Sequence, residues 1–258
     1  MPPEAPDGTA GTATTPPRSS LPSPGSEEAD SGRRESARAG SSQARWIYAP
    51  KTPGTSSGTQ IVAVGIYVAL GDSISIDDYT GVCGGGAASQ LARKLDLNLV
   101  DLTLDGNTTQ GVLADLVRAP AAAEVVTLTA GGNDLLGGVL PRAILRWLHQ
   151  VAERTQPLGA RVVISTIYDP SDGNNDVGRR ELGLSRLATI ELRRRLNAVN
   201  RGIAQLAAER GFLLADLERL FHGHGLASNE PWFVQVIEPN LAGATATAEH
   251  WYELLTSR

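Results

Sequence analysis

The stretch IVAVGIYVALGDSISIDDYTG, residues 61–81, begins with an almost unbroken apolar run and then breaks into a polar turn. An apolar run of this length that ends in a turn is typical of a strand buried on both faces, as in a parallel sheet. The turn reads Gly-Asp-Ser and places Ser73 directly after the strand. A serine at such an exposed strand end is a candidate nucleophile.

The chain after this strand alternates between apolar runs and helical patterns. Four more strands are predicted, at residues 97–104, 123–132, 160–170 and 212–217. Helices are predicted at residues 85–96, 109–119, 140–155, 185–211 and 240–258. This alternation predicts an α/β fold of three α/β/α layers around a five-stranded parallel sheet. The expected apolar face of the longest helix comprises Leu187, Ile190, Leu196, Val199, Ile203 and Leu206.

Two regions of the chain differ in composition. Residues 1–59 hold nine of the fifteen prolines, and their six basic and six acidic residues cancel in charge. Such a segment buries too little apolar surface to offset the entropy of ordering it, so we expect a disordered Pro/Ser/Gly-rich tail. Residues 60–258 are expected to form one folded domain, which is long enough to bury an apolar core without metals or disulfides.

Composition excludes several classes of protein. A net charge of −5 gives no basic footprint for nucleic acid, and the single cysteine, Cys83, excludes an internal disulfide. No stretch reaches the roughly 18 apolar residues of a membrane span. The N-terminus lacks the basic and apolar regions of a signal peptide, so a cytoplasmic location is expected. The spacing of the acidic residues matches no metal-binding loop, and no cofactor or metal is predicted.

The polar turns after the predicted strands meet at one edge of the sheet. In a parallel α/β sheet, chemistry gathers at the carboxyl ends of the strands. Gly106 comes after the second strand and offers a backbone N–H, while Asn133 comes after the third and offers a neutral side-chain amide. Together with the N–H of Ser73, these groups are candidates for an oxyanion hole.

The motifs GDSIS, Gly106 in LDGNTT, and GGND at residues 131–134 together resemble the first three sequence blocks of the SGNH (GDSL-type) hydrolases. The resemblance runs from Ile61 to the C-terminus. It implies a flavodoxin-like three-layer fold and hydrolysis of small-molecule esters, commonly acyl or acetyl groups on lipids or carbohydrates. It further implies that Ser73 forms an acyl-enzyme and that Ser73, Gly106 and Asn133 hold the oxyanion.

The fourth block departs from the pattern of that family. The family has Asp-x-x-His-Pro before the last helix, whereas this chain reads QVIEPNLAG, with Pro239 in place. Glu238 stands in the histidine position and Gln235 in the aspartate position. Because an unperturbed Glu has a pKa of about 4.3 against about 6.5 for His, it is a weaker proton acceptor at neutral pH unless burial raises its pKa.

The proton acceptor therefore has two candidates. His224, in the glycine-containing loop FHGHG after the fifth strand, is the preferred replacement for the missing histidine, and Glu238 is the other candidate. The leading function is a serine esterase or deacylase. The alternative is a catalytically degenerate domain that binds an acyl or glycan ligand. A flavodoxin-like nucleotide-binding or receiver-type module ranks lowest, since it gives Gly106 and Asn133 no reason to complement Ser73.

Overall fold

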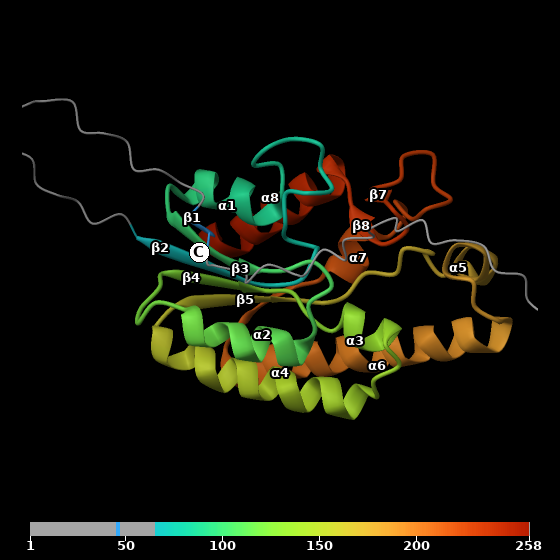
Figure 1. Ribbon diagram of the computed structural model, residues 1–258, viewed down its shortest axis with the longest axis horizontal. Helices are drawn as coiled ribbons and strands as arrows, with labels where there is room; N and C mark the ends of the chain where they lie inside the picture. The colour runs from blue at the N-terminus through green and yellow to red at the C-terminus, as the bar shows by residue number, and fades with distance from the viewer. Residues whose placement is uncertain (1–44, 47–64, 258) are drawn as a thin grey trace, which may run out of the picture. The chain divides into compact units, whose positions relative to one another are not determined.

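A computed structural model of the chain describes residues 65–257, together with the short strand β1 (Arg45–Trp46). Its main sheet contains five parallel strands in the order β3-β2-β4-β5-β6 (Figure 1). Their bounds are β2 (Ile66–Gly71), β3 (Asn98–Thr103), β4 (Val125–Leu128), β5 (Arg161–Ser165) and β6 (Leu213–Ala215). The five-stranded parallel prediction is confirmed. In addition, β1 pairs antiparallel with β3 at the edge, and the rest of the predicted tail lies outside the described residues.

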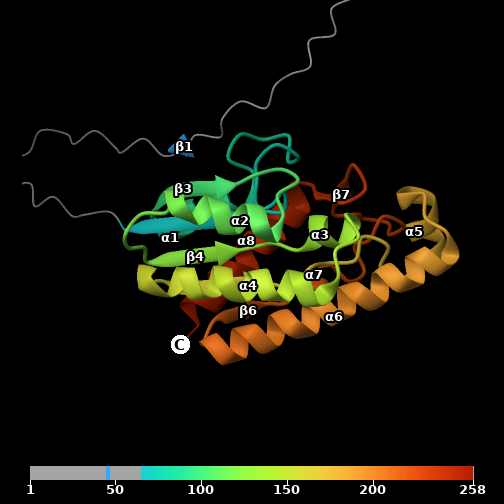
Figure 2. The same cartoon turned by 60° about the horizontal axis from the view of Figure 1, so that its bottom comes forward.

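Helices cover both faces of the sheet, as the three-layer prediction requires (Figures 1 and 2). One layer contains α1 (Ala87–Leu95) and α8 (Leu241–Thr256), which pack against each other. The other layer contains α2 (Thr109–Asp115), α4 (Pro141–Thr155) and α6 (Arg186–Arg210). Across the described residues, no helix is both long and apolar enough to cross a membrane.

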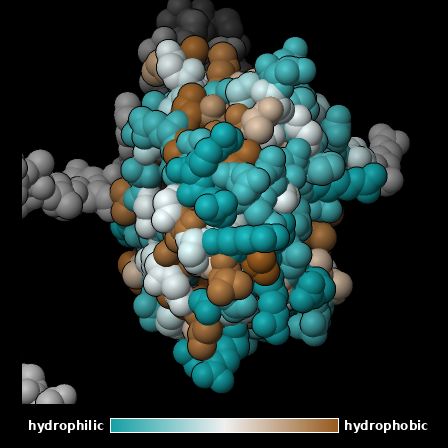
Figure 3. Space-filling model, turned by 90° about the vertical axis from the view of Figure 1, so that its right-hand side faces the viewer, coloured by the Kyte–Doolittle hydropathy of each residue, from teal (hydrophilic) through white to brown (hydrophobic). Residues whose placement is uncertain are grey.

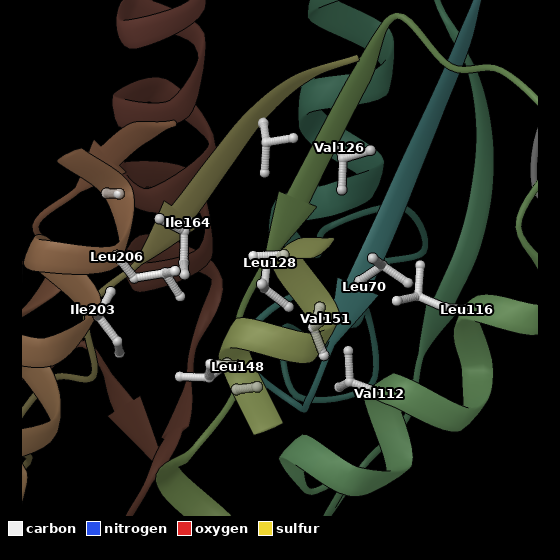
Figure 4. Close-up of a cluster of buried hydrophobic side chains, with 14 of the residues drawn as sticks. Leu70, Val112, Leu116, Val126, Leu128, Leu148, Val151, Ile164, Ile203 and Leu206 are labelled. Atoms are coloured by element: carbon white, nitrogen blue, oxygen red, sulfur yellow. The ribbon is translucent and has the colours of Figure 1, made fainter. Parts of the chain in front are cut away.

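Two apolar cores lie between these layers, one on each face of the sheet. Val68 and Leu70 of the central strand β2 point to the core under α2, α4 and α6, part of which is drawn in Figure 4. Tyr67 and Ala69 point to the core under α1 and α8. Successive side chains of β2 therefore point to opposite faces of the sheet, and both faces are buried. This explains why the sequence of β2 is apolar throughout and does not alternate between apolar and polar residues.

The long helix α6 is buried over only part of its predicted apolar face. Leu196, Val199, Ile203 and Leu206 are buried as expected, but Leu187 and Ile190 are 79% and 44% exposed, so that part of the prediction is wrong. The physical reason is length: the N-terminal part of α6 extends beyond the sheet, where it packs against α5 (Asn175–Leu182) instead (Figure 1).

Smaller elements complete the chain between these helices and strands. They are the helices α3 (Gly132–Leu136) and α7 (Leu217–Phe221), the short 3-10 helices at Leu116–Arg118 and Gln156–Leu158, and a hairpin of β7 (Phe233–Val234) and β8 (Glu238–Pro239). Of these, α3 begins shortly after β4, and the hairpin leads into α8. The helices α3 and α7, each of which follows a strand, lie at the carboxyl edge of the sheet.

Candidate active site

The turn after β2 depends on a glycine. Gly71 has φ of +147°, and a Cβ atom there would lie 2.1 Å from the Thr129 hydroxyl oxygen and 2.3 Å from the Thr129 carbonyl oxygen. The close approach lets the Thr129 hydroxyl accept the Asp72 N–H at 3.3 Å and contact the Ser75 hydroxyl at 3.2 Å. The strand end next to the candidate nucleophile is thus joined to the strand beside it.

Asp72 is buried under this turn and holds its shape. Its carboxylate accepts the backbone N–H of Ile74 at 3.3 Å, across Ser73. The pKa of Asp72 is raised to about 6, mainly by burial and to a smaller extent by the charge of Glu238, while hydrogen bonds from Thr129 and from the Ile74 N–H oppose the rise. Asp72 therefore fixes the backbone on both sides of Ser73 and, with Ser73, lines the cavity described below.

Glu238 interacts with Ser73. Burial raises the pKa of the Glu238 carboxyl, and hydrogen bonding with the Ser73 side chain opposes the rise. The charge of Asp105 also raises it. The second carboxyl oxygen of Glu238, Oε2, is buried and has no hydrogen-bond partner among the described residues. The structure thus brings together the serine and the carboxylate that replaces the family histidine.

The hairpin that carries Glu238 is strained. Gln235 and Val236 in its turn have φ of +46° and +74°, a left-handed conformation that is costly for a β-branched side chain such as Val236. The turn is closed by the Ile237 N–H donating to the Gln235 carbonyl at 2.9 Å. The hydroxyl of buried Tyr168 donates to the Ile237 carbonyl at 2.7 Å and anchors the hairpin next to the site. Gln235 is exposed and takes no part in orienting Glu238.

The candidate oxyanion donors lie on two connected loops. Gly106 adopts φ of +69° in the turn after β3, and Asn133 lies in the first turn of α3. The Asn133 amide donates one hydrogen to the Asn107 carbonyl at 2.9 Å, which leaves its second N–H for another acceptor. The Asn107 side chain in turn donates to the Gly71 carbonyl at 3.2 Å. These bonds tie the second and third loops to the strand end before Ser73.

Two further contacts fix the same loops. Buried Asp134 accepts both the N–H and the hydroxyl of Thr109 at 2.9 Å each, which joins the starts of α2 and α3. The Tyr79 hydroxyl donates to the Asp105 carboxylate at 2.9 Å, beside Gly106. Burial is the largest cause that raises the pKa of Tyr79 to about 12, followed by its hydrogen bond to Asp105 and the negative charges of Asp105 and Glu238. Tyr79 is therefore protonated and acts as the donor in this bond.

A cavity of about 100 Å³, partly open to solvent, extends from Ser73 and Asn133. Its wall is mainly apolar and is formed by Ile74, Leu135, Leu136, Ile167, Leu182, Leu192, Leu196 and Ile237. Asp169 and Arg193 add one ion pair to the lining, with 3.4 Å between Arg193 Nε and an Asp169 carboxylate oxygen. An apolar cavity with a few polar groups next to a nucleophile is typical of a substrate pocket.

The histidines of the FHGHG loop make other contacts. His224 stacks on Trp232 with ring centroids 3.7 Å apart, and its Nδ1 lies 3.2 Å from the Glu230 carbonyl oxygen. His222 pairs with Asp172. Neither histidine lines the cavity beside Ser73, whereas Ser73 and Asn133 do. Of the two candidate proton acceptors, the structure brings Glu238 to Ser73 and holds His224 against Trp232.

Sequence reasoning missed several residues that build the site. Thr129 lies inside the third apolar strand pattern and carries no sequence signal for its contacts with Asp72 and Ser75. Tyr168 and Asn107 also read as ordinary strand-end and turn residues. The one available signal was the glycine directly before the Asp-Ser turn. Because Gly71 has no side chain, it can adopt a positive φ and lie close to Thr129 on the adjacent strand.

The parallel sheet, the serine after its interior strand β2 and the neighbouring asparagine loop define the α/β fold of the SGNH hydrolases. The chain belongs to the GDSL-like lipase/acylhydrolase family, whose model matches residues 69–246. No curated protein sequence matches the chain.

Solved structures share the fold. A lipolytic protein of the G-D-S-L family from Veillonella parvula is 20% identical and covers 75% of this chain and 99% of its own, with a TM-score of 0.60. An extracellular lipase from Streptomyces rimosus is 22% identical and covers 75% of this chain and 99% of its own, with a TM-score of 0.55. The acetylxylan esterase Axe2 from Geobacillus stearothermophilus is 17% identical and covers 75% of this chain and 95% of its own, with a TM-score of 0.59.

Proposed function

We propose that the chain is a serine esterase that cleaves carboxylic esters through an acyl-enzyme on Ser73, with Glu238 as the proton acceptor. The observation that carries the proposal is the interaction between the Ser73 hydroxyl and the buried Glu238 carboxyl. Membership of a lipase/acylhydrolase family supports the reaction class. The apolar cavity beside Ser73 favours an ester with an aliphatic acyl group.

The first half of the reaction forms the acyl-enzyme. Ser73 Oγ attacks the ester carbonyl carbon as its proton passes to the Glu238 carboxylate. The negative charge on the former carbonyl oxygen is held by the N–H groups of Ser73 and Gly106 and by the free amide N–H of Asn133. When the tetrahedral intermediate collapses, the carbonyl re-forms, the C–O bond to the alcohol breaks, and Glu238 returns the proton to the leaving oxygen.

The second half releases the acid. Water gives a proton to Glu238 and attacks the acyl carbon, and the proton then passes to Ser73 Oγ as the acyl–serine bond breaks. A carboxylate with an ordinary pKa is a weak acceptor for this proton. Burial of Glu238 raises its pKa, which makes it a stronger base than an exposed glutamate and a workable acid for the leaving group.

Hydrolysis of p-nitrophenyl butyrate by Ser73→Ala and Glu238→Gln tests the proposal, with the exposed Glu230→Gln as a matched control. We expect Ser73→Ala to abolish turnover and Glu238→Gln to lower kcat/KM by roughly 10²–10⁴-fold. Glu230→Gln is expected to keep full activity. Undiminished turnover by Ser73→Ala would overturn the proposal.

The degenerate alternative makes a separate prediction. A domain that binds a ligand without turnover would leave Ser73 unlabelled by a fluorophosphonate probe, whereas an activated serine reacts with it covalently. Intact mass measurement of the wild type after exposure to the probe decides between them. Labelling that Glu238→Gln loses supports the esterase, and an unlabelled wild type supports the binding role.

A further inference from the structure

The projecting end of α6 exposes apolar and basic side chains together. Arg186, Leu187, Ile190 and Arg194 are all exposed, and their spacing of one, three and four residues places them along one side of the helix. This side of α6 is separate from the cavity, whose lining takes Leu192, Arg193 and Leu196 from the same helix. We refer to these four exposed residues as the α6 tip.

The charge around the α6 tip is opposite to that of the chain. Residues 175–195 contain six arginines and three acidic residues, whereas the chain has a net charge of −5. Arg194 lies 3.6 Å from Glu191. Arg180 and Arg186 are exposed and make no ion pair with any acidic residue of the described chain. Arg179, Arg193 and Arg195 also pair with acidic residues, so the excess positive charge near the tip comes from Arg180 and Arg186.

The same end of the molecule opens toward the substrate cavity. Leu135, Leu136, Leu182 and Leu192 line both the cavity beside Ser73 and a shallower hollow that continues along α6. At the rim, Leu136 is 46% exposed. Figure 3 views the molecule from the side of α5 and the projecting part of α6 in Figure 1, and shows apolar surface broken up by strongly polar side chains.

We propose that the α6 tip docks the protein on an anionic lipid surface. A helix end that combines exposed Leu and Ile with arginines has the composition of an interfacial anchor, in which the apolar residues enter the headgroup region and the cations meet lipid phosphates. The inference concerns binding and stands independently of ester hydrolysis.

Two other occupants fit less well. A second copy packed on the same surface would bring the arginines of both tips together, which opposes association. The N-terminal segment of residues 1–59 has equal numbers of basic and acidic residues, so it offers no net negative charge to the tip. A surface of anionic lipid complements both the charge and the exposed apolar side chains.

Vesicle co-sedimentation of the full chain carrying Ser73→Ala tests the proposal without hydrolysis of the lipid. Vesicles of equal parts phosphatidylcholine and phosphatidylglycerol are compared with phosphatidylcholine alone, at low and high salt. The double variants are Leu187→Asp with Ile190→Asp and Arg186→Gln with Arg194→Gln. Matched controls are Val117→Asp, which is 78% exposed elsewhere, and Arg201→Gln, exposed further along α6.

We expect binding to the mixed vesicles only, weakened by salt because the charges are exposed. Each arginine near an anionic surface contributes roughly a fivefold change in affinity, so Arg186→Gln with Arg194→Gln should weaken binding about tenfold or more. Leu187→Asp with Ile190→Asp should weaken binding by about tenfold or more as well, because it removes the apolar side chains and adds negative charge. The controls should bind as the parent does. No binding to the mixed vesicles, equal binding by the variants, or a concentration-dependent dimer abolished by Leu187→Asp with Ile190→Asp would each overturn the proposal.

Discussion

The side-chain amide of Asn133 donates a hydrogen bond of 2.9 Å to the backbone carbonyl of Asn107, the residue after Gly106. Two of the three loops that carry the proposed oxyanion donors are therefore joined directly. Because one amide hydrogen is held by this bond, the other has a fixed direction before substrate arrives. Such preorganisation is what makes oxyanion donors effective, since no reorientation is needed as charge develops.

Asn133→Ala should therefore lower kcat/KM for p-nitrophenyl butyrate by roughly 10²–10³-fold, the usual loss of one oxyanion donor. The neighbouring Asp134→Ala should act differently. It removes both hydrogen bonds to Thr109 and is expected to lower the free energy of unfolding by about 2–3 kcal/mol. Activity assays and urea unfolding of the two variants separate the roles; equal activity losses at equal stability would contradict this assignment.

The pH dependence of catalysis should report the carboxyls beside Ser73. A general base must be ionised, and the pKa of Glu238 is raised above its ordinary value of 4.5, mainly by burial. We expect kcat/KM to fall on the acid side with a midpoint above that value. The charge of Asp105 contributes to raising the pKa of Glu238, so Asp105→Asn should move the midpoint to lower pH. An acid arm that persists unchanged in Glu238→Gln would exclude Glu238 as the base.

Asp72 should also make stability depend on pH. Its pKa is raised from 3.8 to about 6 in the folded protein, so folding favours the protonated form. This contribution is fully present below pH 3.8 and is lost as pH rises through 6, a change of about 3 kcal/mol. The difference in unfolding free energy between wild type and Asp72→Asn, measured by urea denaturation from pH 4 to pH 7, should show that dependence on pH. A constant difference across this range would contradict it.

Gly71→Ala should be strongly destabilising. The added Cβ would lie 2.1 Å from the Thr129 hydroxyl oxygen and 2.3 Å from a backbone oxygen, at a φ that alanine rarely adopts. We expect a loss of about 3 kcal/mol or more. Gly159→Ala is the matched control, because φ is also positive there but the space is open, and it should cost about 1 kcal/mol. Similar thermal unfolding of both variants would show that the contact with Thr129 is unimportant.

The strands and large helices could be predicted because burial on both sheet faces leaves a direct mark on the sequence. All five parallel strands have apolar cores, as Val68 and Leu70 show for β2. The short elements could not be predicted in the same way. Helix α5 contains few buried residues and the strands of the β7–β8 hairpin are only two residues long, so tertiary contacts rather than periodicity decide them. For the same reason Leu187 and Ile190 matched a buried helical face although no layer of the fold covers them.

Parts of the candidate site could be predicted from chain order alone. Ser73, Gly106 and Asn133 each come after a strand, and the carboxyl ends of parallel strands share one edge of the sheet. The contacts of Glu238 and His224 could not be obtained in this way. Both lie in loops whose paths depend on specific anchors, namely Tyr168 for the hairpin and Trp232 for the histidine.

Ser73 and Glu238, the two side chains of the proposed reaction, differ in how firmly the surrounding fold holds them. Ser73 lies at the end of the central strand of the sheet, so moving it requires disturbing both cores. Glu238 lies on a two-residue strand after a turn with two strained residues, anchored through Tyr168. The identity of the proton acceptor can therefore change with little consequence for the rest of the fold. Under the proposed reaction, a substitution at the acceptor position would therefore disturb the folded domain less than one around the nucleophile.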